Sequence, residues 1–362
     1  MSKEVKVLLT GIGGPTPRGI AKSLKKYAKY DTYYIIATDC NPYALGLYEK
    51  KYIDKAYIVP AVTNENYWEI ILDIIKKEKI DVAIVQPEVE VEEWSRYLKN
   101  NTIPCKHLLP PYDLVVKLRN RQYMNDLLKD TDYIPKSLFL DRDNMKFKKI
   151  EKEIGYPCWM RSSRGSSGLG ALKINNIEEA EAWLKINSKI EAFTVSEYLP
   201  GRNMACKCLY KNGELIRAAS AERLRYLMAK VAPSGITGNI SFGKLISEEK
   251  LLNIAIGAIN NICDKINVKA NGLLTVDFKE DKDSIPKITE INVRNIAINT
   301  VFAIANANIV EDMVQLSLGN ENIFTQKGLY KYDKEYYIFR DVDSEPLVIA
   351  SDEILKEYKI GE

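Results

Sequence analysis

GLLTVDF (272–278) and KITEINVR (287–294) are two short segments in which apolar or β-branched residues alternate, and this pattern predicts two strands. The stretch between them is charged and ends in Ser-Ile-Pro, which favours a hairpin loop. Glu290 and Asn292 are two residues apart, so their side chains share one face of the sheet. A symmetric hairpin places Asp277 directly opposite Glu290, where like charges destabilise the strand pair unless a cation lies between them.

These side chains predict a metal site. Ligands that are all oxygen suit Mg²⁺ or Mn²⁺, and Mg²⁺ usually combines one or two carboxylates with substrate phosphates. We therefore expect Asp277, Glu290 and Asn292 to coordinate one or two Mg²⁺ ions, with Mn²⁺ as an alternative. The competing interpretation is an acidic, solvated hairpin face, and the hairpin alone does not decide between the two.

The composition is that of an ordinary globular protein. With 362 residues, 46% of them apolar and 28% charged, the chain is long enough for two or three domains. The net charge of +3 gives no basis for binding to nucleic acid or to a membrane surface. The start of the chain does not resemble a signal peptide, and no run of 18 uncharged apolar residues occurs, so we expect a cytoplasmic protein.

Cysteine and histidine chemistry is disfavoured. The six cysteines show no Cys-X-X-Cys spacing, so we expect neither disulfides nor a zinc site. The single histidine, His107, argues against a Ser-His-Asp triad and against a metal site with several histidines. Catalysis is therefore expected to depend on carboxylates, arginines, lysines and backbone amides.

The first third of the chain alternates predicted strands with predicted helices. The strands are expected over 5–11, 33–39 and 81–87, and the helices over 17–29, 66–79 and 90–100. This alternation predicts an α/β domain with a parallel sheet that is covered by helices on both faces.

The pattern changes after residue 112. Two prolines in LLPPYDL predict a linker. We expect, in order, a helical bridge over 113–132, a small α/β lobe over about 133–200, a larger lobe over about 201–325 that carries the metal hairpin, and a strand-rich tail over 326–362.

Four segments resemble motifs of the ATP-grasp superfamily, in the order that is typical of that superfamily. They are NRQYMNDLLKDTDYIPKS (120–137), GYPCWMRSSRGSSGLGALKI (155–174), SEYLPGR (196–202), and the metal strands with their pattern DF…EIN-x-R. The match runs from about Leu114 to about Leu318. The segment ATDCNPYALGLYEKKYIDKAYIVP (37–60) adds a resemblance to the carbamoyl-phosphate-synthetase-large-subunit-like, carboxylate–amine ligase branch.

The resemblance implies a fold. It implies a Rossmann-like pre-ATP-grasp domain of the α/β class over 1–112, followed by a two-lobed ATP-grasp domain of the α+β class over 113–325. The remaining residues, 326–362, form the C-terminal tail. Full-length carbamoyl phosphate synthetase large chains carry two such halves, whereas this chain carries one.

The resemblance also implies an ATP site whose phosphates contact one loop and two arginines. Arg161 precedes the loop, and Arg121 would be the second phosphate contact. The amides of small residues can approach phosphate oxygens closely. The loop residues are Ser162, Ser163, Gly165, Ser166, Ser167 and Gly168. Ser162 stands where the superfamily usually has proline.

The hinge between the lobes is expected to bind the nucleoside. The backbone near Val195 and Ser196 would recognise adenine, and Glu197 would accept from the ribose hydroxyls or from the adenine amino group. Asn203 occupies the place of a second glutamate, which puts that second contact in doubt.

Arginines are the candidate catalytic residues. Arg294 lies two residues after Asn292, on the same strand face, and in the superfamily this arginine helps to bind the transferred phosphate. Arg223 and Arg225, together with Lys230, are candidates for holding a carboxylate or an acyl phosphate. For each of these three, a solvated charge is an equal alternative.

GIGGPTPRG (11–19) lies between a predicted strand and a predicted helix, as a dinucleotide-binding loop would. However, Thr16 replaces the third glycine, although Asp39 ends the next strand where a ribose-binding acid could lie. We prefer a tight turn whose following helix N-terminus faces the cleft and binds an anionic part of the acceptor substrate.

The resemblance implies an ATP-grasp ligase. It would use ATP and Mg²⁺ to convert a small-molecule carboxylate into an acyl phosphate, which an amine or a thiol then attacks, with release of ADP and phosphate. A homodimer is left open. One alternative is a carbamoyl-phosphate-synthetase-like enzyme that phosphorylates bicarbonate. The other is a non-catalytic ATP-binding regulatory protein, which the intact set of Asp277, Glu290, Asn292 and Arg294 argues against.

Overall fold

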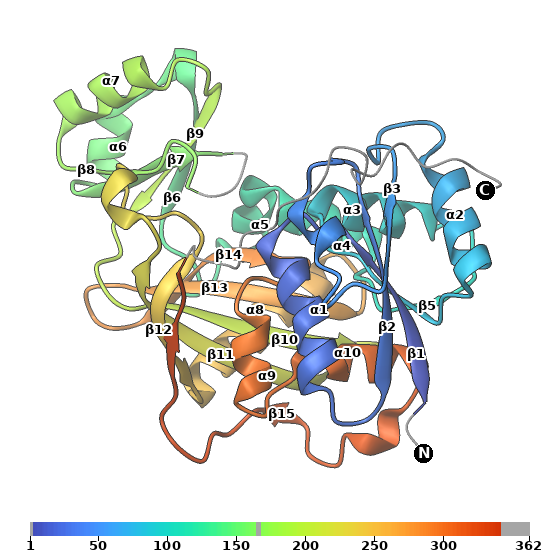
Figure 1. Ribbon diagram of the computed structural model, residues 1–362. Coiled ribbons are helices and arrows are strands. Elements are labelled where there is room, and N and C mark those ends of the chain that lie inside the picture. Colours follow the sequence, from blue (N-terminus) through green and yellow to red (C-terminus); the bar gives the residue numbers. More distant parts are fainter. Residues whose placement is uncertain (1–2, 164–167, 342–362) are drawn as a thin grey trace.

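The computed structural model describes residues 3–163 and 168–341 (Figure 1). Within these residues the strands form three sheets, of five, seven and four strands. Short 3₁₀ helices lie in connecting segments: η1 (Leu45–Tyr48), η2 (Arg142–Asn144), η3 (Ala229–Val231) and η4 (Glu321–Ile323). No helix in the described part of the chain is long and apolar enough to span a bilayer.

The N-terminal sheet is parallel, with strand order β3-β2-β1-β4-β5. Its strands are β1 (Glu4–Thr10), β2 (Thr32–Asp39), β3 (Lys55–Ile58), β4 (Val82–Ile84) and β5 (Lys106–His107). The helices that follow are α1 (Pro15–Tyr27), α2 (Tyr67–Glu78) and α3 (Glu88–Tyr97). Consecutive residues of β1, such as Leu8 and Leu9, are fully buried, because helices cover both faces of the sheet. The predicted Rossmann-like fold is confirmed.

The four-stranded sheet is antiparallel, with order β6-β9-β7-β8, and stands apart from the rest in Figure 1. Its strands are β6 (Ser137–Asp141), β7 (Cys158–Ser162), β8 (Leu172–Ile174) and β9 (Ala192–Glu197), and its helices are α6 (Phe147–Glu153) and α7 (Ile177–Ile186). Met160, Phe193 and Val195 form part of a separate small core. The helices α4 (Tyr112–Arg119) and α5 (Arg121–Leu128) connect the N-terminal sheet to this lobe.

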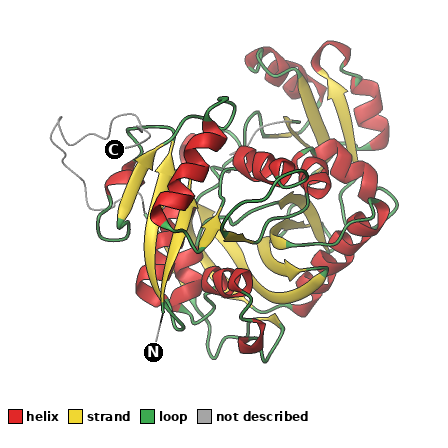
Figure 2. Ribbon diagram, turned by 90° about the vertical axis from the view of Figure 1, so that its right-hand side faces the viewer, coloured by secondary structure: helices red, strands yellow, loops and turns green. Residues whose placement is uncertain are grey.

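The large sheet has the order β14-β13-β10-β11-β12-β16, and β15 pairs with β11. Its strands are β10 (Asn203–Lys211), β11 (Glu214–Tyr226), β12 (Ile240–Ile246), β13 (Gly272–Glu280), β14 (Pro286–Asn292), β15 (Gly328–Leu329) and β16 (Tyr337–Phe339). Helix α8 (Glu249–Lys265) packs on one face. The other face packs against α9 (Asn299–Ile304) and α10 (Ile309–Leu318). The side view shows these curved strands with helices around them (Figure 2).

Hydrogen bonds fasten α1 of the N-terminal sheet to the large lobe. Thr300 Oγ1 donates to the Gly19 carbonyl over 3.2 Å, and Asn308 Nδ2 donates to the Tyr27 carbonyl over 3.1 Å. The Glu311 carboxylate accepts from the backbone amides of Lys29 and Tyr30. These contacts join α1 and the turn after it to α9 and α10 of the large lobe. The strand-rich tail was predicted over 326–362; β15 and β16 lie inside it, and residues 342–362 lie outside the described residues.

Candidate functional site

Two opposed carboxylates lie at the centre of the site. Asp277 on β13 pairs with Glu290 on β14, as the hairpin pattern predicted, and the register shifts directly after this pair. Arg223 Nη2 donates to Asp277 Oδ1 over 2.7 Å, and Arg121 Nη2 donates to Glu290 Oε2 over 2.6 Å. Because each carboxylate has an arginine partner, their mutual repulsion is compensated within the protein.

The arginines around Glu290 come from different parts of the chain. Arg121 is the first residue of α5, and the side chain of the preceding Asn120 caps this helix by accepting from the amide of Gln122. Arg161, near the end of β7, donates to the Thr289 carbonyl over 2.9 Å, and its Nη1 lies 3.8 Å from Glu290 Oε2. The helical bridge and the small lobe therefore both place a cation on the hairpin of the large lobe.

Burial and the neighbouring charges shift the pKa values of these groups. Burial alone would raise the pKa of Glu290, but the neighbouring Arg121 and Arg161 outweigh it, so this pKa is lowered. Burial dominates at Asp277 and raises its pKa, although Arg223 acts against this. Burial, together with the positive charge of Arg121, lowers the pKa of Arg161 to about 10. Glu290 is accordingly a stable carboxylate at neutral pH.

Asn292 and Arg294 contact a residue of the N-terminal domain. In the orientation that satisfies its neighbours, the Asn292 amide donates to Glu290 Oε1 over 3.0 Å and to Glu88 Oε1 over 3.2 Å. Arg294 Nη2 lies 3.1 Å from the same Glu88 oxygen. Glu88 was not among the predicted site residues, although it follows the predicted strand over 81–87, at the strand end where parallel sheets bind their ligands.

A cavity of about 210 Å³ lies between the two lobes. Most of the predicted ATP and metal residues line it, and they include Arg121, Arg161, Gly168, Ser196, Glu197, Asn203, Asp277 and Glu290. Arg223 lines it as well. Tyr226 was not predicted; its hydroxyl accepts from Asn203 Nδ2 over 2.9 Å. Asn203 also accepts from Arg223 Nη1 over 2.8 Å. Because Arg223 is the partner of Asp277, this asparagine connects the predicted nucleoside contacts to the carboxylate pair.

Some predicted residues do not reach this cavity. Arg225 is exposed, because β11 shifts register on both sides of it and Tyr226 turns inward in its place. The Val195 side chain is fully buried in the core of the small lobe. Ser162 is buried, and its amide donates to the Leu169 carbonyl, while the Ser163 hydroxyl accepts from Thr194 Oγ1 over 3.3 Å.

The tip of the predicted phosphate loop cannot be compared with the structure, since Gly165, Ser166 and Ser167 lie outside the described residues. The exposed Lys230, a further candidate, does not line the cavity between the lobes.

A second, larger crevice of about 910 Å³ adjoins the first. Its N-terminal wall consists of the loops after β1 and β4 and the first turns of the helices that follow them, and it includes Thr16, Gln86 and Glu88. These two strands are neighbours where the strand order reverses, and such a switch point is where open α/β sheets bind ligands. Arg121 and Glu290 line both cavities, so the carboxylate hairpin forms their common wall.

The glycine loop after β1 is stabilised by its own contacts. Asp39 Oδ2 accepts from the Gly13 amide over 2.7 Å, and Asp39 Oδ1 accepts from the Asn41 amide over 2.9 Å. Pro15 and Pro17 have no N–H groups, so the first turn of α1 offers few donors to an anion. This arrangement favours the tight-turn interpretation over a dinucleotide site, and it also weakens the expected anion site at α1.

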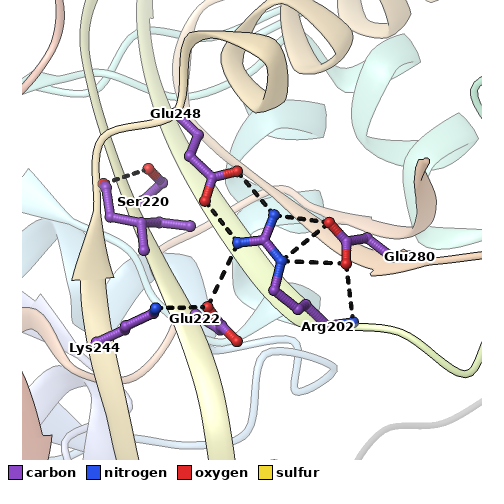
Figure 3. A network of polar contacts seen from close by, with 7 residues as sticks. Arg202, Ser220, Glu222, Lys244, Glu248 and Glu280 are labelled. Carbon is purple, nitrogen blue, oxygen red and sulfur yellow. Dashed lines mark hydrogen bonds and ion pairs between the residues drawn. The ribbon is translucent and has the colours of Figure 1, made fainter. Parts of the chain in front are cut away.

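The hinge segment is fixed to the large lobe by Arg202 (Figure 3). Its guanidinium contacts Glu248 over 2.7 Å and Glu280 over 2.7 Å, and lies 3.6 Å from Glu222. A Cβ atom on Gly201 would lie 2.5 Å from the Glu280 side chain, so only glycine fits before this arginine. The ion pairs of Arg202 therefore fix the segment at which the small lobe joins the large lobe.

The profile of the family described as PylC-like, N-terminal domain matches residues 7–98. A search of curated protein sequences finds no match. Many solved structures are similar to the chain, among them three that match it over most of its length. An N5-carboxyaminoimidazole synthetase from Staphylococcus aureus complexed with ADP has a TM-score of 0.69 at 16% identity, over 94% of this chain and 83% of its own.

An L-amino acid ligase from Bacillus licheniformis has a TM-score of 0.60 at 12% identity, over 90% of this chain and 77% of its own. A D-alanine–D-alanine ligase from Bacillus anthracis has a TM-score of 0.57 at 13% identity, over 89% of this chain and 99% of its own. At such low identity the likeness establishes the fold and leaves the substrates open. The chain therefore has the fold of the ATP-grasp superfamily, and residues 7–98 are similar to the PylC-like N-terminal domain family.

Proposed function

We propose that this protein is an ATP-dependent ligase that phosphorylates a small carboxylic acid and couples it to an amine or a thiol. The observation that carries the proposal is the opposed pair of Asp277 and Glu290, which lies between two adjoining cavities. The cavity between the lobes would hold ATP. The crevice at the β1/β4 switch point would hold the acid and its acceptor.

The hairpin fits a magnesium site. Asp277, Glu290 and Asn292 supply oxygen donors, which are the ligands that Mg²⁺ prefers. Arg121, Arg161 and Arg223 compensate the carboxylate charge in the structure, and phosphates bound with the ion would offer these arginines new partners. The bound ion would neutralise the phosphate charge that develops during transfer.

Side chains around the first cavity would position the nucleotide. Arg121 and Arg161 would contact the phosphates, together with the backbone at Gly168, whereas the Ser163 amide donates to the Ala192 carbonyl over 2.9 Å. Glu197 lies at the hinge and accepts from the Lys136 amide over 3.0 Å through one carboxylate oxygen. Its other oxygen remains available for the ribose or the adenine amino group.

Activation by phosphate fits the residues around both cavities. A carboxylate is a poor electrophile, and transfer of the γ-phosphoryl group converts one of its oxygens into a leaving group. Arg294, Arg121 and Arg161 would stabilise charge on the transferring group. No cysteine or histidine of the described chain lines either cavity, so a free acyl phosphate, rather than an acyl-enzyme, is the intermediate that we propose.

A panel of carboxylates and amines, screened for substrate-dependent release of ADP, tests this function. We expect ADP release to need Mg²⁺, one acid of the panel, and an amine or a thiol. Release that depends on bicarbonate alone would favour the carbamoyl-phosphate-synthetase-like alternative. Tight ATP binding without turnover by any acid would favour a regulatory protein.

A further inference from the structure

A lysine is buried beneath the site without an opposite charge. Lys207 on β10 is 1% exposed, and its ammonium donates to the Asn299 Oδ1 atom, to the Ile296 carbonyl over 3.3 Å and to Asn295 Oδ1 over 3.4 Å. All three acceptors are neutral, and no described carboxylate forms an ion pair with Lys207. Burying an ammonium group in this way is costly, so its presence calls for a reason other than stability.

The acceptors of Lys207 all lie in the segment that follows the metal strand. Residues 295–298 connect Arg294 to α9, and Ile298 adopts a left-handed φ of 68°, which is strained for a β-branched residue. The hydrogen bonds from Lys207 Nζ hold this turn in place.

Arg294 depends on the same turn. Its Nη1 donates to the Asn295 carbonyl over 2.8 Å, and its own carbonyl accepts from Thr275 Oγ1 over 3.0 Å. Lys207 lies opposite Thr275 in the sheet and so faces the same side as Asp277. Lys207 fixes the Asn295 side chain, and the Asn295 backbone in turn fixes the guanidinium of Arg294.

A small cavity extends this contact to the N-terminal domain. Gln86 Oε1 and Asn295 Nδ2 are buried without a hydrogen-bond partner among the described residues, and both residues line a cavity of about 20 Å³. Arg294 lines it too. A space of this size holds one water molecule, which could accept from Asn295 and donate to Gln86.

We propose that Lys207 is a positioning residue for Arg294, acting through Asn295, and that a water bound between Asn295 and Gln86 extends this support to the β1/β4 switch point. The proposal rests on the proposed function only in assigning Arg294 to the transferred phosphate. Since Lys207 does not line the cavity between the lobes, its loss is expected to slow the reaction without weakening nucleotide binding.

The variant Lys207→Met keeps the aliphatic length and removes the donors. We expect kcat to fall about 10- to 100-fold, because a small displacement of a positioned group costs that much. The Kd for ATP with Mg²⁺, measured by calorimetry, is expected to stay within about 2-fold. Lys207→Gln, which keeps two donors, is expected to recover part of kcat. The matched control is Lys211→Met, on the same strand, since Lys211 donates to the Leu316 carbonyl and pairs with Glu321.

A double-mutant cycle separates positioning from a general structural role. If Lys207 acts through Arg294, Lys207→Met lowers kcat of the wild type but has little further effect on Arg294→Met. Equal losses in both backgrounds, or a wild-type kcat in Lys207→Met, would overturn the proposal.

Crystal structures give a test that does not depend on turnover. We expect a water between Asn295 and Gln86 in the wild type, and a displaced Arg294 guanidinium in Lys207→Met. An unmoved Arg294 would overturn the proposal even if the ligase function holds. A displaced Arg294 in a protein that turns over no acid would leave the positioning role standing and refute the ligase function.

Discussion

Glu88 Oε1 lies 3.1 Å from Arg294 Nη2, so a carboxylate of the N-terminal domain holds an arginine just beyond the end of β14. Glu88 begins α3 directly after the loop that follows β4, and Arg294 lies two residues beyond Asn292. The N-terminal domain thereby supplies part of the site as well as one wall of the larger crevice.

Glu88→Gln removes this ion pair while keeping the side-chain volume. We expect kcat to fall about 10-fold, because the guanidinium loses one of the contacts that orient it. The free energy of unfolding is expected to change by less than about 1 kcal/mol, since the pair is partly exposed. Asp113→Asn is the control. Asp113 forms an ion pair with Lys99 on the surface, away from both cavities. Equal activity in Glu88→Gln and Asp113→Asn would refute a role for Glu88 in the reaction.

Glu290→Gln tests the carboxylate pair itself. We expect turnover to fall on the order of 1,000-fold, because one charged ligand of the proposed Mg²⁺ and the partner of Arg121 are both lost. The melting temperature should stay near that of the wild type, since the amide still accepts a hydrogen bond from Arg121. Asp283→Asn, in the exposed turn of the same hairpin, serves as the control for the fold. Turnover like that of the wild type in Glu290→Gln would remove the hairpin from the mechanism.

The pairing of Asp277 with Glu290 was predictable because two short strands flank a short, charged loop, although the register shifts by one residue between this pair and the loop. The position of Arg225 was not predictable in the same way. A strict alternation puts Arg223 and Arg225 on one face, but two register shifts in β11 turn Tyr226 toward the cavity instead. A bulge changes which face a residue takes without leaving a periodic signal in the sequence.

Contacts between distant segments also lay beyond sequence analysis. Glu88 and Arg294 belong to different domains, and no local pattern links them. Lys207 lies in a strand that is buried on both faces, so a lysine there gave no periodic signal of its own. The strands β3 and β5 were missed because they are short, with four and two residues, and carry lysines where a buried strand is expected to be apolar.

Arg202→Met tests the anchor of the hinge. The change leaves the buried Glu280 and Glu222 carboxylates without this cation, and we expect the free energy of unfolding at pH 7 to fall by about 1–2 kcal/mol, a value that allows for the partial exposure of Arg202. Lys331→Met, which removes an exposed partner of Glu249, is expected to change it by less than about 0.5 kcal/mol.

The loss of stability in Arg202→Met is expected to depend on pH. Burial would raise the pKa of Glu280, but Arg202 outweighs this effect and the pKa is lowered. A carboxylate with a lowered pKa contributes stability above the pKa of the unfolded state and loses that contribution as the pH falls. The difference between the wild type and Arg202→Met, measured by denaturant unfolding, should therefore shrink below about pH 4. A difference that stays constant down to pH 3 would contradict the assigned ion pair.

Lys207 predicts a second pH dependence of stability, in a higher pH range. Burial lowers the pKa of Lys207 to about 7, and the groups that face its ammonium are amide and carbonyl oxygens and the Phe302 ring. Arg294 is the nearest charged residue along the turn that Lys207 holds. Between pH 7 and the ordinary lysine pKa, the unfolded state binds the proton and the folded state does not. Stability from this residue therefore rises with pH, by at most about 1.4 kcal/mol per unit.

This trend is measured as the difference in unfolding free energy between the wild type and Lys207→Met from pH 6 to pH 10. We expect the wild type to gain relative to the variant above pH 7. Parallel curves would show that Lys207 keeps an ordinary pKa in the folded protein.

The central claim is that ATP activates a carboxylate as an acyl phosphate between the two cavities. The most direct measurement supplies ATP, Mg²⁺, an acid identified in the panel, and hydroxylamine in place of the amine. The account predicts a hydroxamate of that acid, together with equal amounts of ADP and phosphate. Formation of AMP and pyrophosphate would show that the enzyme adenylates its substrate, and would contradict the mechanism assigned to Asp277, Glu290 and Arg294.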